Sequence, residues 1–260
     1  IYIDFLEYLA AQKMFSTSQL SQDLFVSYFT EEKKNGFFVE FGATDGITLS
    51  NTYIFEKYCN WTGILAESLP FWHNDLIKNR KCIIDKRCIF SESNLKKKFV
   101  NTYESPELSG LEDELKDYSS MRDFNVEARK KKEIIIVKTV SLEDLLKEHK
   151  APKKIDYLSI DTEGSEYTIL KNFNFKKYNV ENIYFWADTF LAWRDQEFDE
   201  FIKMYSNIKL PFWCQTRIET VDEEKFRKMS DVGLDRVTFG LEHGNEKFRA
   251  EMVKREYTNE

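Results

Sequence analysis

The fold of this chain is decided by residues 37–46, which read FFVEFGATDG. The first five residues are an apolar run after a polar breaker at 33–36, and their length and composition predict a buried strand. The next five predict a tight loop, because Gly42 and Gly46 remove side chains where the backbone must turn sharply or approach a ligand. Ser50-Asn51-Thr52 then predicts the capped start of a helix.

Outward from this stretch, helical and extended patterns alternate along the chain. The apolar spacing predicts helix over residues 1–30. Strands are predicted over 62–67, 82–85, 133–140 and 155–161, and further helices over 141–148 and 165–170. The charged stretch 91–133 contains turn signals and predicts an insertion or lid over the acceptor rather than sheet. Strands that alternate with helices predict an α/β fold with a mostly parallel sheet and right-handed crossovers.

The composition sets limits on the class of protein. The 260 residues suffice for one large α/β domain, or for one domain and a fragment, and 42% of them are hydrophobic. A formal net charge of -7 argues against nucleic acid as the main partner. The lysine runs at 96–98 and 130–132 lie among acidic residues, so we expect them on solvated loop or helix faces.

Compartment and metal content follow from the cysteines and histidines. The four cysteines have no metal-ligand spacing, and the three histidines add no convincing metal site, so we predict no metal and a reducing cytoplasm. No apolar run approaches the length of a membrane span, and no signal segment opens the chain. Because the first residue is Ile1 rather than Met, we expect a processed, trimmed or incomplete N-terminus.

Three predicted strands end in residues that suit a binding site. Ligands of open parallel sheets bind beyond the carboxyl ends of the strands. The loop 42–46 lacks the dinucleotide GxGxxG pattern, which favours a nucleoside without phosphates over the cofactor of an oxidoreductase. Glu67 could accept hydrogen bonds from ribose hydroxyls, and Asp161 with Glu163 could orient a hydroxyl and accept its proton. The alternatives are a surface Glu67 and an Asp161 that pairs with a lysine.

These same segments resemble the FkbM family of S-adenosylmethionine (SAM)-dependent methyltransferases. The resemblance rests on residues 38–46, 50–53, 63–67 and 155–166, whose order and spacing match across residues 35 to about 180. It implies a Rossmann-like methyltransferase that uses SAM and methylates a hydroxyl of a sugar or another small metabolite.

The resemblance also implies roles for individual residues. The loop 42–46 would hold the methionine part of SAM, Glu67 the ribose and Asp85 the adenine side, with Asp161 and Glu163 at the methyl-transfer face. The full cofactor-binding set is Glu40, Gly42, Thr44, Asp45, Gly46, Asn51, Thr52, Glu67, Ser68 and Asp85.

A second resemblance begins near Ile183. Residues 184–190, 211–217 and 239–246 are similar to strand ends of a cobalamin-associated radical-SAM barrel, in which residues like Arg217 and Glu242 face the interior. The three cysteines of a CxxxCxxC cluster motif are absent, which argues against radical chemistry by this chain. We therefore predict a methyltransferase domain over 1–182 and a partial radical-SAM-like α/β segment over 183–260.

The role of the second segment has two open alternatives. It could continue the first sheet, through a strand at 182–186, a helix at 196–205 and a strand at 210–215. It could be an appended or truncated piece, in which case the chain would be a fragment or fusion without independent activity. An exposed strand edge there would invite association into a homo-oligomer.

Overall fold

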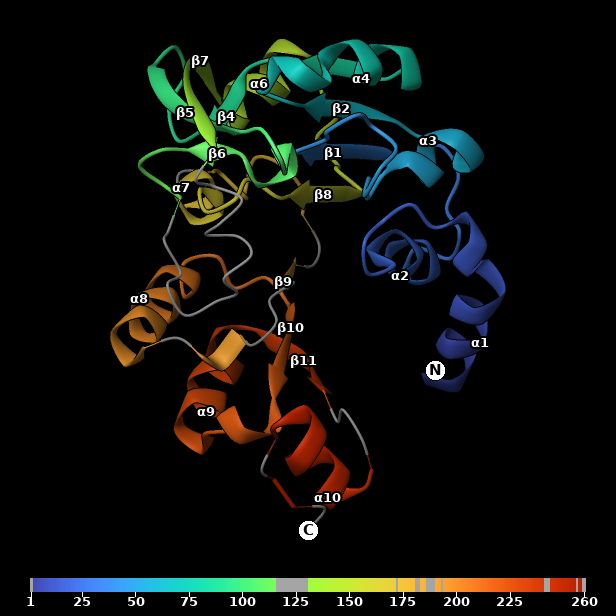
Figure 1. Cartoon of the computed structure of the whole chain (residues 1–260), viewed down its shortest axis with the longest axis vertical. Helices are drawn as coiled ribbons and strands as arrows, with labels where there is room; N and C mark the ends of the chain where they lie inside the picture. Colours follow the sequence, from blue (N-terminus) through green and yellow to red (C-terminus); the bar gives the residue numbers. More distant parts are fainter. Residues whose placement is uncertain are drawn as a thin grey trace. The chain divides into compact units, whose positions relative to one another are not determined.

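The computed structural model describes residues 2–115, 131–171, 173–180, 183–185, 190–192, 194–240, 244–255 and 257–258. The chain divides into two compact units, Ile1–Asn179 and Val180–Glu260. Each unit has its own parallel sheet and its own apolar core, so each is described separately below (Figure 1).

The N-terminal unit contains two four-stranded sheets. The strands are β1 (Phe37–Phe41), β2 (Thr62–Ala66), β3 (Ile83–Asp85), β4 (Cys88–Phe90), β5 (Lys96–Thr102), β6 (Gly110–Leu111), β7 (Lys132–Ser141) and β8 (Tyr157–Ile160). The helices are α1 (Tyr2–Gln12), α2 (Gln22–Phe29), α3 (Tyr53–Cys59), α4 (His73–Asn79), α6 (Leu142–Glu148) and α7 (Glu166–Leu170). The predicted helix over 1–30 is therefore two helices, α1 and α2.

The first sheet has the order β3-β2-β1-β8, and all of its neighbouring strands are parallel. Strand β1 lies between β2 and β8, and its residues from Phe38 to Phe41 are all buried, as expected of a parallel strand covered on both faces. On one side of the sheet the core gathers Phe38, Phe55, Trp61 and Leu65. The carboxyl ends of β1, β2 and β8 therefore meet at one edge of a rigid sheet.

The second sheet corrects the prediction for residues 91–133. Its order is β4-β7-β5-β6, and β5 pairs antiparallel with both β6 and β7. The lysine run at 96–98 opens β5 and does not lie on a loop or helix face. Lys97 Nζ lies 4.5 Å from the centre of the Phe90 ring and 3.1 Å from Asp113 Oδ2. The run was misread because cation–π and ion-pair partners, which the local sequence does not reveal, make a lysine-rich strand stable. Residues 116–130 lie outside the described residues.

The C-terminal unit has a parallel three-stranded sheet of the order β11-β10-β9. Its elements are β9 (Ile183–Phe185), α8 (Asp195–Tyr205), β10 (Phe212–Arg217), α9 (Glu223–Val232), β11 (Leu234–Gly240) and α10 (Glu246–Phe248). Phe198, Phe201, Tyr205 and Phe212 form the centre of its core. In the described part of the chain these strands form a three-stranded sheet of their own.

Candidate active site

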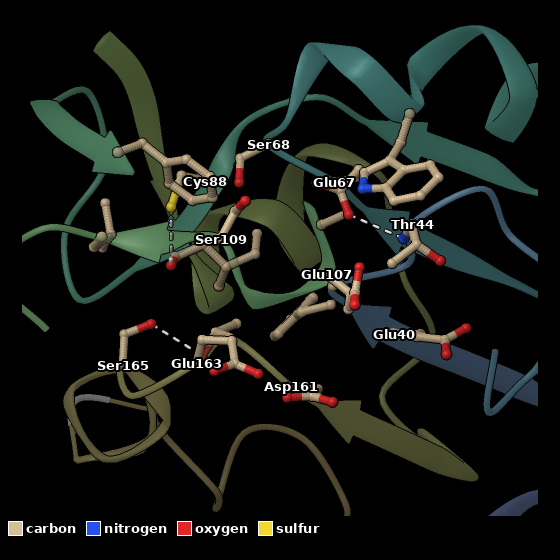
Figure 2. A pocket seen from close by; sticks show the side chains of 18 of the residues that line it. Glu40, Thr44, Glu67, Ser68, Cys88, Glu107, Ser109, Asp161, Glu163 and Ser165 are labelled. Carbon is tan, nitrogen blue, oxygen red and sulfur yellow. Dashed lines mark hydrogen bonds between the residues drawn. The ribbon is translucent and has the colours of Figure 1, made fainter. Parts of the chain in front are cut away.

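A pocket opens at the carboxyl ends of β1, β2 and β8 (Figure 2). It holds about 840 Å³ of empty space, open solvent at its mouth included, and every residue that lines it belongs to the N-terminal unit. The pocket is therefore located where an open parallel sheet binds its ligand.

The loop after β1 can form only because Gly42 has no side chain. Gly42 has a φ of +74°, and a Cβ at this position would lie 2.1 Å from the carbonyl oxygen of Asp161. Thr44 follows with a φ of +47°, and the Gly46 amide donates to the Ala43 carbonyl at 2.8 Å. The loops after β1 and β8 thus contact each other through their backbones at the base of the pocket.

Glu40, at the end of β1, holds the start of α3. Its carboxylate accepts hydrogen bonds from the Ser50 hydroxyl (3.0 Å), the Thr52 hydroxyl (2.5 Å) and the Asn51 amide (2.7 Å). Burial raises the pKa of Glu40, against the opposing effects of Arg80 and of these three donors. A buried carboxylate with this many partners acts first as an organiser of the pocket wall.

Arg80, at the end of α4, was not predicted as a site residue. Its buried guanidinium donates to Glu56 Oε2 (2.9 Å), to the Gly46 carbonyl (2.9 Å) and to the hydroxyls of Ser50 (3.1 Å) and Thr52 (3.0 Å). It also lies 3.9 Å from Glu40 Oε2. One side chain therefore joins the loop after β1, the start of α3 and two carboxylates.

Glu67 directly follows β2 and is 6% exposed. Its Oε2 accepts from the Thr44 amide at 2.9 Å, and its Oε1 accepts from the Leu69 amide at 2.8 Å. Burial raises its pKa to about 7, although these backbone donors favour the charged form. The carboxylate is thus fixed in direction and changes its charge near neutral pH.

Asp161 follows β8 in a loop that Glu166 shapes. The Glu166 carboxylate accepts from the Thr162 amide (2.8 Å) and from the Gly164 amide (3.0 Å). Although Asp161 stays open to solvent through the pocket, the protein around its carboxylate raises its pKa to about 6, and the charges of Glu166 and Glu40 add to this effect. Asp161 is therefore a carboxylate with an enhanced tendency to accept a proton.

Eight of the twelve predicted site residues line the pocket: Glu40, Gly42, Thr44, Asn51, Glu67, Ser68, Asp161 and Glu163. Asn51 donates from Nδ2 to the Ser159 hydroxyl at 3.0 Å, while its buried Oδ1 has no hydrogen-bond partner among the described residues. This orphaned acceptor in the pocket wall suits a ligand that carries a hydrogen-bond donor.

The other four predicted residues support the pocket from behind. Asp45 accepts from the Ile47 and Thr48 amides within its own turn, Gly46 packs on Arg80, and Thr52 is fully buried against Glu40. Asp85 binds Arg87 with both oxygens, at 3.0 and 2.6 Å, and His149 at 2.9 Å. Burial opposes the ionisation of Asp85, but these partners lower its pKa overall. Arg87, which Asp85 positions, lines the pocket itself.

The sequence did not predict the wall of the pocket formed by the second sheet. Phe99, Pro106, Glu107, Ser109 and Leu111 line the pocket from β5, β6 and the turn between them. Ser109 Oγ accepts from the Thr102 amide at 3.0 Å, so its own proton is available for a ligand. The sequence predicted that residues 91–133, with turn signals at Ser105-Pro106 and Ser109-Gly110, cover the acceptor, but nothing local indicated that they form a sheet.

The described residues give no sign of a metal site or a membrane span. They include no group of three or more His, Cys, Asp or Glu side chains that could hold a metal ion. His73 Nε2 lies 2.9 Å from the carbonyl oxygen of Glu67, and burial lowers the pKa of His73.

None of the helices described is both long and apolar enough to cross a bilayer.

The parallel sheet, the helices around it and the polar pocket at its strand ends define a Rossmann-like methyltransferase fold. The sequence matches the family described as "Methyltransferase FkbM domain" over residues 40–209. The chain therefore belongs to the FkbM methyltransferase family. The match extends past the division at Asn179 into the C-terminal unit. Neither the curated proteins nor the solved structures contain a significant match to the chain.

Proposed function

We propose that the protein is a SAM-dependent O-methyltransferase that acts on a hydroxyl of a sugar or another small metabolite. The observation that carries the proposal is the convergence of Glu40, Glu67 and Asp161 on one pocket of a chain that belongs to a methyltransferase family. SAM supplies an activated methyl group. The protein must align an acceptor oxygen with that methyl and take up the proton that the hydroxyl loses.

The pocket residues fit such a cofactor. Glu67 is oriented by two backbone amides and presents a carboxylate to ribose hydroxyls, and the orphaned Oδ1 of Asn51 suits the amino group of the methionine part. Gly42, Thr44 and Ser68 add backbone and hydroxyl groups, while Glu40, Asp45, Gly46, Thr52 and Asp85 hold this wall in place. SAM carries no phosphate, which suits a pocket wall without a glycine-rich pyrophosphate loop.

Asp161 is the proposed catalytic base, with Glu163 beside it at the methyl-transfer face. A carboxylate whose pKa is raised to about 6 accepts a proton more readily than an ordinary aspartate and is still largely ionised at pH 7. With SAM bound, the cofactor would supply the methyl group, and Asp161 would take up the proton that the acceptor hydroxyl loses. Charge balance is thus kept within the pocket.

Calorimetric titration with S-adenosylhomocysteine tests the proposal. We expect micromolar binding to the wild-type chain and loss of binding in Glu67→Ala. Glu7→Ala, which truncates an exposed glutamate on α1, is the matched control and should bind like the wild type. A folded chain that does not bind would favour the alternative of a fragment or fusion without independent activity.

For the C-terminal unit we propose a partial radical-SAM-like α/β segment without radical chemistry of its own. The parallel order β9-α8-β10-α9-β11 suits a piece of a radical-SAM-like barrel as well as an α/β appendage. Glu242 of that second resemblance lies outside the described residues. Anaerobic reconstitution with iron and sulfide should load no cluster, because four cysteines without the CxxxCxxC motif cannot supply its ligands.

We also propose a cytoplasmic location, which the four free cysteines Cys59, Cys82, Cys88 and Cys214 support. The partner is a small-molecule acceptor rather than nucleic acid, in keeping with the net charge of -7. Light scattering of the purified chain would decide between a monomer and a homo-oligomer.

A further inference from the structure

The charged side chains that line the pocket are mostly of one sign. Five of them are carboxylates, Glu40, Glu67, Glu107, Asp161 and Glu163, and the cation among the described lining residues is Arg87. The guanidinium of Arg87 is bound to both oxygens of Asp85 and, at 2.6 Å, to Glu148. Its charge is therefore balanced by carboxylates that do not line the pocket, and carboxylates predominate among the charged side chains of the pocket lining.

These carboxylates differ in how many hydrogen bonds their oxygens accept from the protein. Both oxygens of Glu40 and Glu67 accept hydrogen bonds from the pocket wall. By contrast, no hydrogen bond or ion pair engages the carboxylates of Asp161 and Glu107 among the described residues. Figure 2 shows Glu107, Asp161 and Glu163 around the same opening. The oxygens of Asp161 and Glu107 remain available to a ligand.

The pocket also offers a buried acceptor and an outward donor. Among the described residues Asn51 Oδ1 is buried without a partner, which indicates that a ligand donor, such as the amino group proposed for SAM, belongs in this pocket. The Ser109 hydroxyl accepts from a backbone amide and can donate to a ligand oxygen. Acceptors thus outnumber free donors, which matches a ligand that is rich in O–H or N–H groups.

A phosphate or carboxylate on the acceptor would meet the opposite situation. It would need cations or several N–H donors, and would instead approach carboxylates that repel it in a partly desolvated site. We propose that the pocket selects a methyl acceptor that carries hydroxyl or amino donors and no anionic group, with Glu107, Asp161 and Glu163 as the groups that set this selection. This inference rests on the proposed methyltransferase function and narrows its substrate class to neutral or amino-bearing polyols, excluding phosphorylated, nucleotide-activated and acidic sugars.

Trp72 provides a direct probe of the pocket charge, because its half-buried side chain lines the pocket. The difference in fluorescence between the wild type and Trp72→Phe isolates its emission from that of the other tryptophans. At constant ionic strength, and relative to free tryptophan, we expect caesium ions to quench this emission at least about threefold more than iodide. Glu107→Gln should lower the ratio, whereas Glu112→Gln, which removes a carboxylate of the same segment outside the pocket lining, should leave it unchanged. Quenching by iodide that equals or exceeds that by caesium would overturn the proposal.

A second experiment identifies the chemical class of the acceptor. Metabolite extracts separated by ion exchange into anionic, neutral and cationic pools are incubated with the full chain and SAM that carries a labelled methyl group. We expect label in the neutral or cationic pool, and label mainly in the anionic pool would refute the inference. If no pool is labelled, the quenching ratio decides. Failure of S-adenosylhomocysteine to bind would instead refute the proposed function, and the two failures are thereby distinguished.

Discussion

The two parallel sheets of this protein obey the same rules of construction and differ at their strand ends. In the sheet β3-β2-β1-β8, three strands end in carboxylates that line one pocket. In the sheet β11-β10-β9, the hydroxyl of the buried Thr216 of β10 already has hydrogen-bond partners in its own unit. It lies 2.7 Å from the Thr220 hydroxyl and accepts from the Leu191 amide at 3.2 Å. A parallel sheet thus offers a place for a site, but a site forms only where strained loops and partly unsatisfied polar groups are held there.

The largest expected difference between the two units concerns Arg80. Arg80→Leu leaves the buried carboxylate of Glu40 and the partly buried carboxylate of Glu56 without their cation, so we expect a loss of about 3–5 kcal/mol in the free energy of unfolding. Urea denaturation monitored by circular dichroism would measure it. The control is Arg236→Ala in β11, where a half-exposed guanidinium stacks at 4.2 Å on Trp213, and the loss should stay below about 1 kcal/mol. Equal losses would show that Arg80 is not the organiser of the pocket.

The second prediction contrasts a strand end inside the pocket with one outside it. Asp161→Asn should reduce turnover about a hundredfold, because the base is lost, while S-adenosylhomocysteine affinity changes little. Single-turnover transfer to the acceptor pool, combined with calorimetry, measures both quantities. Thr216→Val at the end of β10 should leave turnover unchanged. A parallel loss of affinity in Asp161→Asn would assign Asp161 to cofactor binding instead.

A smaller effect is expected from adding one methyl group to a glycine in each unit. Gly42→Ala forces a side chain into a positive φ and against the Asp161 carbonyl, and should cost about 1–3 kcal/mol of stability and weaken S-adenosylhomocysteine binding. Gly244→Ala in the C-terminal unit meets open space, so its effect should stay within about 0.5 kcal/mol. Thermal and chemical unfolding of both variants provide the comparison, which fails if both variants are equally stable.

The smallest effect concerns pH. The pKa of Glu67 is raised to about 7, so the carboxylate that we propose to accept ribose hydroxyls is protonated as the pH falls through 7. S-adenosylhomocysteine affinity at pH 6 should be about tenfold below that at pH 8, since one pKa unit corresponds to a tenfold change in the ionised fraction. For folding the sign is opposite: the folded state holds this proton more tightly than the unfolded chain, so this contribution to stability falls as the pH rises from about 4.5 to 7.

Glu67→Gln is the control for the pH prediction. Its binding should be weak and independent of pH, and its stability should lose the slope between pH 4.5 and 7. A pH dependence of affinity that survives in this variant would have to come from another group, and Asp161, with its pKa near 6, would be the next to test.

Local patterns predicted most strands of the first sheet and the carboxylates at their ends. The apolar run of β1, the glycine loop and the strands that end at Glu67 and near Asp161 are each visible within about ten residues of sequence. The second sheet was missed because β5 opens with three lysines and lacks the alternation of a half-buried strand. Its partners in β7 lie 30 or more residues away, where no local signal reaches.

The sequence by itself determined the alternation of strands and helices, the carboxylates at three strand ends and membership of the methyltransferase family, because these depend on short-range spacing. Only the tertiary structure decided that the Gly42 backbone contacts the Asp161 carbonyl and that Arg80 ties the loop after β1 to α3. It also decided that Asp85 binds Arg87 and His149 and does not line the pocket. Glu107 and Ser109 line the pocket at the strand ends for the same reason. These contacts join residues far apart in the chain, and their partners are fixed by packing and burial rather than by any local pattern.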